Sequence, residues 1–323
     1  MKAAVLGAGV IGAGWAARFL LHGWDVAVWD TDSRAMERVK AVQTRAADAL
    51  SKLYDIALPR PGNLNHYKDV TAAVADCDWI QESIPEQLEI KQALYAGIAG
   101  AVRENVPVAS STSGFKPTEL ASGSPLAHQI LVCHPFNPVY LIPGVEVVPG
   151  EKTAAEIAAL APQILRSIGM QAVVIDAEID AHVADRLLEA VWREALWLVN
   201  DGVATTSQID EIIRTTFGLR WAQMGLFETY RLAGGEGGFR HFLQQFGPAL
   251  QWPWTKLMDV PELTDELVDR IVAQSDEQSM GRNLAQMEDQ RDRNLVALLR
   301  ALKDEGQGAG LGISRFEAGD YRP

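Results

Sequence analysis

Three polar residues, Ser113, His134 and Glu146, have the types and spacing of a proton-transfer site. Ser113 ends a Ser-Ser-Thr-Ser run, His134 begins the segment HPFNP, and Glu146 follows twelve residues later. Imidazole has the unperturbed pKa nearest neutrality, so His134 can accept the proton of a hydroxyl group. A carboxylate can orient that ring, and a serine hydroxyl can hydrogen-bond a substrate oxygen. Singly, each could be a capping residue or a solvated strand end, but together they favour catalysis.

A glycine motif near the start of the chain has the spacing of a dinucleotide site. The segment Gly7-Ala8-Gly9-Val10-Ile11-Gly12 lies between an apolar run and a helical pattern, and Asp30 follows a second apolar run. The glycines allow a tight turn and close approach of the backbone to a pyrophosphate at the helix N-terminus. Asp30 follows Gly12 by 18 residues, close to the distance of about 20 at which an acid in such motifs binds the adenosine ribose and repels a 2′-phosphate. The motif therefore predicts NAD, although Arg34 is of a type that can contact a 2′-phosphate.

The elements that must position these residues alternate between strands and helices in the first half of the chain. Apolar or β-branched runs occur at 2–6, 25–29, 78–81, 106–110, 130–133, 145–148 and 172–175, with helical patterns between most of them. This order predicts an α/β fold with a Rossmann-type, doubly wound sheet. Ligands of such sheets bind beyond the carboxyl ends of the strands, where Ser113 and His134 are expected.

The second part of the chain has only a helical pattern. Apolar residues recur every three to four positions at 181–200, 207–216, 239–246, 262–279 and 282–303. We therefore predict a Rossmann domain over 1–180 and an all-helical domain over 181–304. Glycines at alternate positions from Gly306 to Gly312 favour a flexible tail over 305–323.

The composition excludes several classes of protein. The net charge of −13 repels nucleic-acid phosphates and anionic lipids, so neither partner is expected. The two cysteines, Cys77 and Cys133, match neither a zinc site nor a disulfide framework, so we expect no metal and a cytoplasmic location. No run of 18 or more apolar residues occurs, and no membrane span is predicted.

Together these motifs resemble the 3-hydroxyacyl-CoA dehydrogenase superfamily. The resemblance rests on the glycine motif with Asp30, the Ser-Ser-Thr-Ser run, HPFNP with its following glutamate, and Asp185-Arg-Leu-Leu188. It covers all but about the last twenty residues. It implies that Ser113 binds substrate, that His134 is the catalytic base and that Glu146 is the carboxylate paired with it.

The same resemblance implies further contacts with the cofactor. Glu86 and Lys91 match an ExLxxK segment near the nicotinamide ribose, and Asn137 matches a residue that contacts both cofactor and substrate. Without the resemblance, the segment 86–91 would be interpreted as an ordinary solvated helix start.

One departure from the broader superfamily bears on the substrate. Asp185 stands where the acyl-CoA enzymes have an asparagine, and a carboxylate suits a quaternary ammonium better than a neutral thioester. Nine aromatic residues fall between positions 217 and 254, and aromatic faces attract trimethylammonium groups. The candidates for such a cage are Tyr140, Trp221, Phe227 and Tyr230. Alternatively, Asp185 is only a charge in a first helical turn, and the rings build a core or a subunit interface.

The resemblance is closest to members that act on L-carnitine, so we expect NAD-dependent oxidation of its 3-hydroxyl to 3-dehydrocarnitine. The alternative substrates are a 3-hydroxyacyl-CoA and L-gulonate. A protein of another class, a crystallin-like binder of dinucleotides without turnover, is disfavoured by the intact Ser113, His134 and Glu146. The helical domain resembles a dimerisation domain, so a homodimer is expected.

Overall fold

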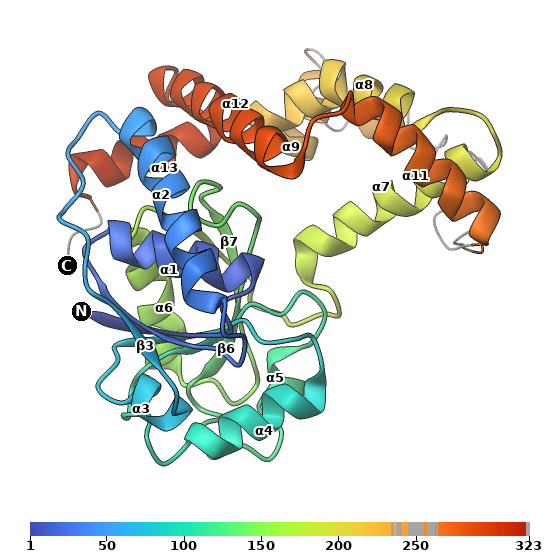
Figure 1. Ribbon diagram of the computed structural model, residues 1–323. Helices are drawn as coiled ribbons and strands as arrows, with labels where there is room; N and C mark the ends of the chain where they lie inside the picture. Colours follow the sequence, from blue (N-terminus) through green and yellow to red (C-terminus); the bar gives the residue numbers. More distant parts are fainter. Residues whose placement is uncertain (234–235, 237–240, 245–254, 257–261, 263, 321–323) are drawn as a thin grey trace. The chain divides into compact units, whose positions relative to one another are not determined.

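The computed structural model describes residues 1–233, 236, 241–244, 255–256, 262 and 264–320 (Figure 1). The chain folds as two compact units. One comprises Met1–Asp185 together with Asp292–Pro323, and the other comprises Arg186–Arg291. The structure differs here from the predicted division at residue 180, because the end of the chain returns to the first unit.

An eight-stranded sheet forms the centre of the first unit, in the order β3-β2-β1-β4-β5-β6-β7-β8. Neighbouring strands are parallel except β6 and β7, which are antiparallel. The strands are β1 (Lys2–Leu6), β2 (Asp25–Trp29), β3 (Leu64–Tyr67), β4 (Trp79–Glu82), β5 (Val108–Ser110), β6 (Ile130–Pro135), β7 (Gly144–Pro149) and β8 (Gln171–Val174). The strand order reverses beside β1, which creates a crevice at the carboxyl ends of β1 and β4. The predicted doubly wound sheet is confirmed.

Helices cover both faces of this sheet. Successive side chains of a strand point to opposite faces, and the apolar side chains of β1 must therefore be buried on both. Ala3 and Val5 pack in one apolar cluster with Trp15 of α1, whereas Ala4 and Leu6 pack in another with Tyr95 of α4. The helices between the strands are α1 (Val10–Leu21), α2 (Ala35–Leu53), α3 (Val70–Val74), α4 (Leu88–Ile98), α5 (Pro117–Leu120) and α6 (Ala155–Ser167). In Figure 1, α1 and α4 lie on opposite sides of the sheet.

Helices joined by short connections, with no strand, make up the described residues of the second unit, as predicted. Its helices are α7 (His182–Asn200), α8 (Thr206–Thr215), α9 (Phe217–Ala233), α11 (Asp265–Ser279) and the start of α12 (Leu284–Asp304). Gly225, with φ of 70°, interrupts α9. Of the helix predicted at 239–246, residues 239, 240, 245 and 246 lie outside the described residues. No helix in the described ranges is long and apolar enough to cross a membrane.

The end of the chain is a packed helix, which corrects the predicted flexible tail over 305–323. Helix α13 (Gly308–Ala318) contributes Ile313 to an apolar cluster with Leu50 of α2 and Leu299 of α12. A Cβ on Gly310 would lie 2.1 Å from the backbone of Leu302, and a Cβ on Gly312 would meet the side chain of Gln171. At these two positions glycine therefore permits close packing of the helix.

Candidate active site

The glycine motif turns the chain from β1 into α1. Gly7 has a φ of +87°, and a Cβ on Gly12 would lie 1.8 Å from the Gly7 carbonyl oxygen, so both positions require glycine for local packing. A Cβ on Gly9, in contrast, would meet no atom of the described residues within 4 Å. The N-terminus of α1 has no side-chain cap and no acidic residue in its first turn. An uncapped helix start beside open space fits the pyrophosphate of a dinucleotide.

Asp30 holds this loop from the end of β2. Its carboxylate accepts hydrogen bonds from the backbone N–H of Ala8 at 2.6 Å and of Asp32 at 2.7 Å. The acid therefore lies beside the glycine loop, where the adenosine ribose of a dinucleotide binds in this type of fold.

His134 and Glu146 face each other across the antiparallel strands β6 and β7. They are partners in the strand register, and Nδ1 of His134 lies 2.9 Å from Oε2 of Glu146. Oε1 of the same carboxylate accepts hydrogen bonds of 3.0 Å from the backbone N–H groups of Val183 and Ala184, at the start of α7. Because Nδ1 is occupied in this way, Nε2 is the nitrogen that can take a proton from a ligand.

The charge state of Glu146 follows from these contacts. Burial acts to raise its pKa, but the hydrogen bonds from His134 and from the backbone of Ala184 and Val183 outweigh burial, and the pKa is lowered. The carboxylate therefore stays ionised near neutral pH and can stabilise a positive charge on the imidazole.

Asp185 brings a second carboxylate to the other side of the histidine ring. Its Oδ2 lies 3.8 Å from Nε2 of His134, beyond normal hydrogen-bond length, and 24% of its side chain is exposed. A ligand in contact with Nε2 can therefore also approach this carboxylate.

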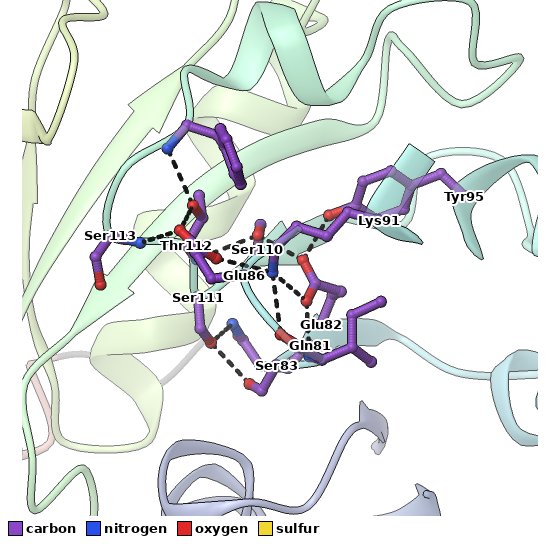
Figure 2. A network of polar contacts seen from close by, with 12 residues as sticks. Gln81, Glu82, Ser83, Glu86, Lys91, Tyr95, Ser110, Ser111, Thr112 and Ser113 are labelled. Atoms are coloured by element: carbon purple, nitrogen blue, oxygen red, sulfur yellow. Dashed lines mark hydrogen bonds and ion pairs between the residues drawn. The ribbon is translucent and has the colours of Figure 1, made fainter. Parts of the chain in front are cut away.

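A polar network holds the loop that carries Ser113 (Figure 2). Oε1 of Glu86 accepts hydrogen bonds from the Thr112 hydroxyl and from the backbone N–H groups of Ser113 at 3.1 Å and Gly114 at 3.2 Å. Thr112 is buried, whereas Ser113 is exposed and its hydroxyl points away from Glu86. The network thus fixes the backbone of the loop and leaves the Ser113 hydroxyl for a ligand.

A buried ion pair supports Glu86 from within the fold. Nζ of Lys91 lies 2.7 Å from Oε1 of Glu82 and 3.2 Å from Oε2 of Glu86. Tyr95 and Ser110 donate hydrogen bonds to Oε2 of Glu82, at 2.8 and 2.6 Å. A buried carboxylate is costly unless it is paired and hydrogen-bonded, and these partners satisfy Glu82.

Glu86 and Lys91, the two residues expected near the nicotinamide ribose, differ in how much of their side chains is exposed to solvent. Lys91 is 1% exposed, so it has almost no surface with which to touch a cofactor, whereas 45% of the Glu86 side chain is exposed. Glu82 and Thr112 were not predicted. Glu82 is the last residue of β4 and follows the predicted run 78–81 directly, so a charged residue at the end of a strand was the available signal.

His182, the first residue of α7, is a further residue of the site that was not predicted. Its ring centroid lies 5.5 Å from that of His134, and its side chain is buried. Burial and the nearby His134 lower the pKa of His182, which keeps this ring neutral near neutral pH. Its position three residues before Asp185 was the only sequence signal.

Comparison with known families matches both parts of the chain. Residues 2–179 match the NAD binding domain of 3-hydroxyacyl-CoA dehydrogenase, and residues 182–273 match the C-terminal domain of the same enzymes. The chain belongs to the 3-hydroxyacyl-CoA dehydrogenase family. Membership confirms the resemblance seen in the motifs and the expected cofactor, NAD.

Individual relatives extend this likeness along the chain. An L-carnitine dehydrogenase/betainyl-CoA thioesterase of Agrobacterium fabrum is 55% identical over 317 residues, 98% of this chain, which spans 65% of that relative's length. An L-carnitine dehydrogenase of Mesorhizobium japonicum is 52% identical over 99% of this chain and 88% of its own length. The likeness therefore reaches into the last twenty residues, beyond the part of the chain that the motifs cover.

A solved structure shows the same fold. The crystal structure of 5-formyl-3-hydroxy-2-methylpyridine 4-carboxylic acid 5-dehydrogenase superposes with a TM-score of 0.77 at 28% identity. The match covers 94% of this chain and 98% of that chain.

Tyr140 is not brought to the site. Its side chain is 3% exposed, packs in the apolar cluster of α2 and α13, and donates a hydrogen bond to Asp292. A ring enclosed in this way cannot contact a substrate, which corrects the prediction that Tyr140 belongs to an aromatic cage. Asn137, in contrast, is exposed just after β6, next to Phe136, whose ring centroid lies 4.8 Å from that of His134.

The other aromatic candidates belong to α9 in the second unit. Trp221 is 39% exposed, Phe227 72% and Tyr230 37%. Trp221 packs on Phe217 with ring centroids 4.7 Å apart, and Tyr230 stacks on Phe242 at 4.6 Å. The aromatic residues at 239, 246, 252 and 254 lie outside the described residues.

Proposed function

We propose that this chain oxidises the 3-hydroxyl of L-carnitine to the ketone of 3-dehydrocarnitine, with NAD as the hydride acceptor. The observation that carries the proposal is the position of Asp185, 3.8 Å from Nε2 of His134. In L-carnitine only two carbon atoms separate the hydroxyl oxygen from the trimethylammonium nitrogen. A hydroxyl on Nε2 therefore brings the cation within reach of Asp185. The names of the relatives from Agrobacterium and Mesorhizobium support the same substrate.

In the proposed reaction, His134 is the general base. Its Nε2 accepts the hydroxyl proton while the C3–H bond breaks and the carbonyl group forms. NAD, when bound, supplies the acceptor for the hydride. Glu146 orients the ring through Nδ1 and stabilises the imidazolium, and Ser113 donates a hydrogen bond to the substrate oxygen. Asp185 attracts the trimethylammonium group.

The remaining predicted contacts divide between the two parts of the chain. Within residues 1–180, the glycine loop from Gly7 to Gly12, Asp30, Glu86 and Asn137 are the proposed contacts of the cofactor. Within 181–304, Trp221, Phe227 and Tyr230 are the proposed aromatic contacts of the cation, since each ring has an exposed surface.

We also propose that the protein is a cytoplasmic homodimer. Leu187, Leu188, Trp192 and Ile212 are apolar side chains of the second unit that are each more than half exposed, and such surfaces commonly form subunit interfaces. Light scattering should give twice the mass of the chain, and Trp192→Glu should shift it towards the monomer. Cys77 and Cys133 are free thiols, as suits a reducing compartment.

A substrate panel tests the proposed activity. L-carnitine, D-carnitine, 3-hydroxybutyryl-CoA and L-gulonate are each offered with NAD, and the absorbance of NADH is followed. We expect turnover of L-carnitine, with the His134→Gln variant as the background. Faster turnover of 3-hydroxybutyryl-CoA or of L-gulonate than of L-carnitine would identify an acyl-CoA or a sugar acid as the substrate instead. Absence of turnover together with tight NADH binding would instead support the crystallin-like alternative.

A further inference from the structure

Two arginines lie beside the acid that is proposed to bind the adenosine ribose. Ala8 connects Asp30 with one of them, because its N–H donates to Asp30 while its carbonyl oxygen accepts a hydrogen bond of 2.6 Å from Nε of Arg38. Arg34 follows Asp30 by four residues, and 80% of its side chain is exposed. Guanidinium groups in this place are what a 2′-phosphate would require, because they bind phosphate through charge-assisted hydrogen bonds. Their presence conflicts with a simple preference for NAD.

Asp32 engages both arginines. Its Oδ2 lies 3.1 Å from a terminal nitrogen of Arg38, and its Oδ1 lies 3.8 Å from Nε of Arg34 and accepts a 2.9 Å hydrogen bond from the backbone N–H of Arg34. The backbone of Arg34 is the largest cause of a lowered pKa at Asp32, followed by the side chain of Arg38. Asp30 in turn accepts the N–H of Asp32 at 2.7 Å, so both acids belong to one turn.

We propose that Asp32 is a second determinant of the preference for NAD over NADP, because it pairs with Arg38 and lies close to the exposed Arg34, and so weakens the attraction of both arginines for a 2′-phosphate. The proposal rests on the dinucleotide site described above. Asp30 repels the phosphate directly, whereas Asp32 removes the cations that would attract it. Together the two acids balance the two arginines, and the turn as a whole offers no net positive charge. Loss of Asp30 alone therefore leaves the Asp32 carboxylate beside both arginines.

The test measures binding of nucleotide fragments, which does not depend on the substrate that is oxidised. Calorimetry gives the dissociation constants of 2′,5′-ADP and 5′-AMP, whose ratio reports the contribution of the 2′-phosphate. The proteins compared are the wild type, Asp30→Ser, Asp32→Asn and the double variant. The asparagine keeps an oxygen for the N–H of Arg34, so the turn is retained.

We expect Asp30→Ser to shift the ratio of dissociation constants modestly in favour of 2′,5′-ADP. Adding Asp32→Asn to that variant should shift the ratio by a further factor of about ten or more, which is the size of a charge-assisted hydrogen bond. Arg34→Gln with Arg38→Gln should remove this gain. An unchanged ratio on adding Asp32→Asn would overturn the proposal, as would a gain that survives loss of both arginines. Failure of the wild type to bind either nucleotide would overturn the dinucleotide site itself.

Asp48→Asn is the matched control for net charge. Asp48 lies on the same helix as Arg38, is exposed, and pairs with Lys52. It lies thirteen residues after Ala35, the first residue of this helix, which corresponds to about 20 Å along the helix axis. This variant should leave the ratio as in the wild type. A gain equal to that of Asp32→Asn would show that total charge, and not the pairing of the arginines, decides the preference.

Discussion

Replacing Asp185 by asparagine separates recognition of the cation from the chemistry of the base. The carboxylate lies 3.8 Å from Nε2 of His134, so a trimethylammonium group two carbons from the reacting hydroxyl comes within a few ångströms of it. Opposite charges about 4 Å apart attract by roughly 4 kcal/mol at an effective dielectric constant of about 20. With a quarter of the side chain exposed, solvent screening reduces the expected contribution to about 1 to 2 kcal/mol, or roughly 5- to 30-fold in kcat/KM.

The assay compares L-carnitine with 3-hydroxy-5,5-dimethylhexanoate, in which a tert-butyl group replaces trimethylammonium. In Asp185→Asn, kcat/KM for L-carnitine should fall by that factor, while kcat/KM for the neutral analogue should change by less than about threefold. Any effect of Asp185 on His134 is common to both substrates and cancels in the double comparison. Glu189→Gln, which removes an exposed charge from the same helix, serves as the control. Equal losses for both substrates would refute the recognition of charge by Asp185.

Three further predictions address the base, the serine loop and the effect of pH. His134→Gln should lower kcat by about 10²- to 10⁴-fold with NADH affinity retained, and near-normal turnover would remove this residue from the mechanism. Thr112→Val removes the hydroxyl that donates a hydrogen bond to Glu86 and accepts two from the backbone N–H groups of Gly114 and Phe115, and it should lower kcat/KM for L-carnitine about tenfold. Thr112→Ser should restore kcat/KM, and a loss confined to NADH affinity would contradict a role in positioning the loop. Burial, followed by the charge of Arg18, lowers the pKa of His22 from 6.5 to about 3, so between these values the unfolded chain binds a proton that the folded chain does not. The free energy of unfolding should therefore fall as the pH drops below about 6.5, by at most about 1.4 kcal/mol per pH unit, and urea unfolding of His22→Leu at pH 7 and 5 should show a weaker dependence.

The parts of the fold that sequence predicts well are those with local signals. The strands at 2–6 and 25–29 were predicted with their observed bounds, because each is an apolar run ended by a glycine motif or an acid. Strand β3 was missed, since Leu64–Tyr67 has little apolar pattern and lies at the sheet edge, where β2 is its one partner among the described strands. The last helix was missed because alternate glycines favour flexibility unless a tertiary contact requires them.

The site was predictable to the extent that its residues belong to motifs. His134 and Glu146 are close in sequence and pair across adjacent strands, so spacing was informative. Tyr140 was misplaced because its partner, Asp292, is 152 residues away, and no local pattern reveals such a contact. His182 and Glu82 were missed for a related reason, since burial of a polar side chain depends on neighbours from other elements.

The return of α12 and α13 to the first unit has a consequence for how the chain is made. A ribosome releases the chain from its N-terminus, so residues 1–185 emerge long before residue 292. At that stage Leu50 and Leu53 lack the apolar partners that Val296, Leu299 and Ile313 later provide. The nucleotide-binding unit is therefore finished last rather than first, and its final apolar cluster closes only when synthesis has passed residue 313.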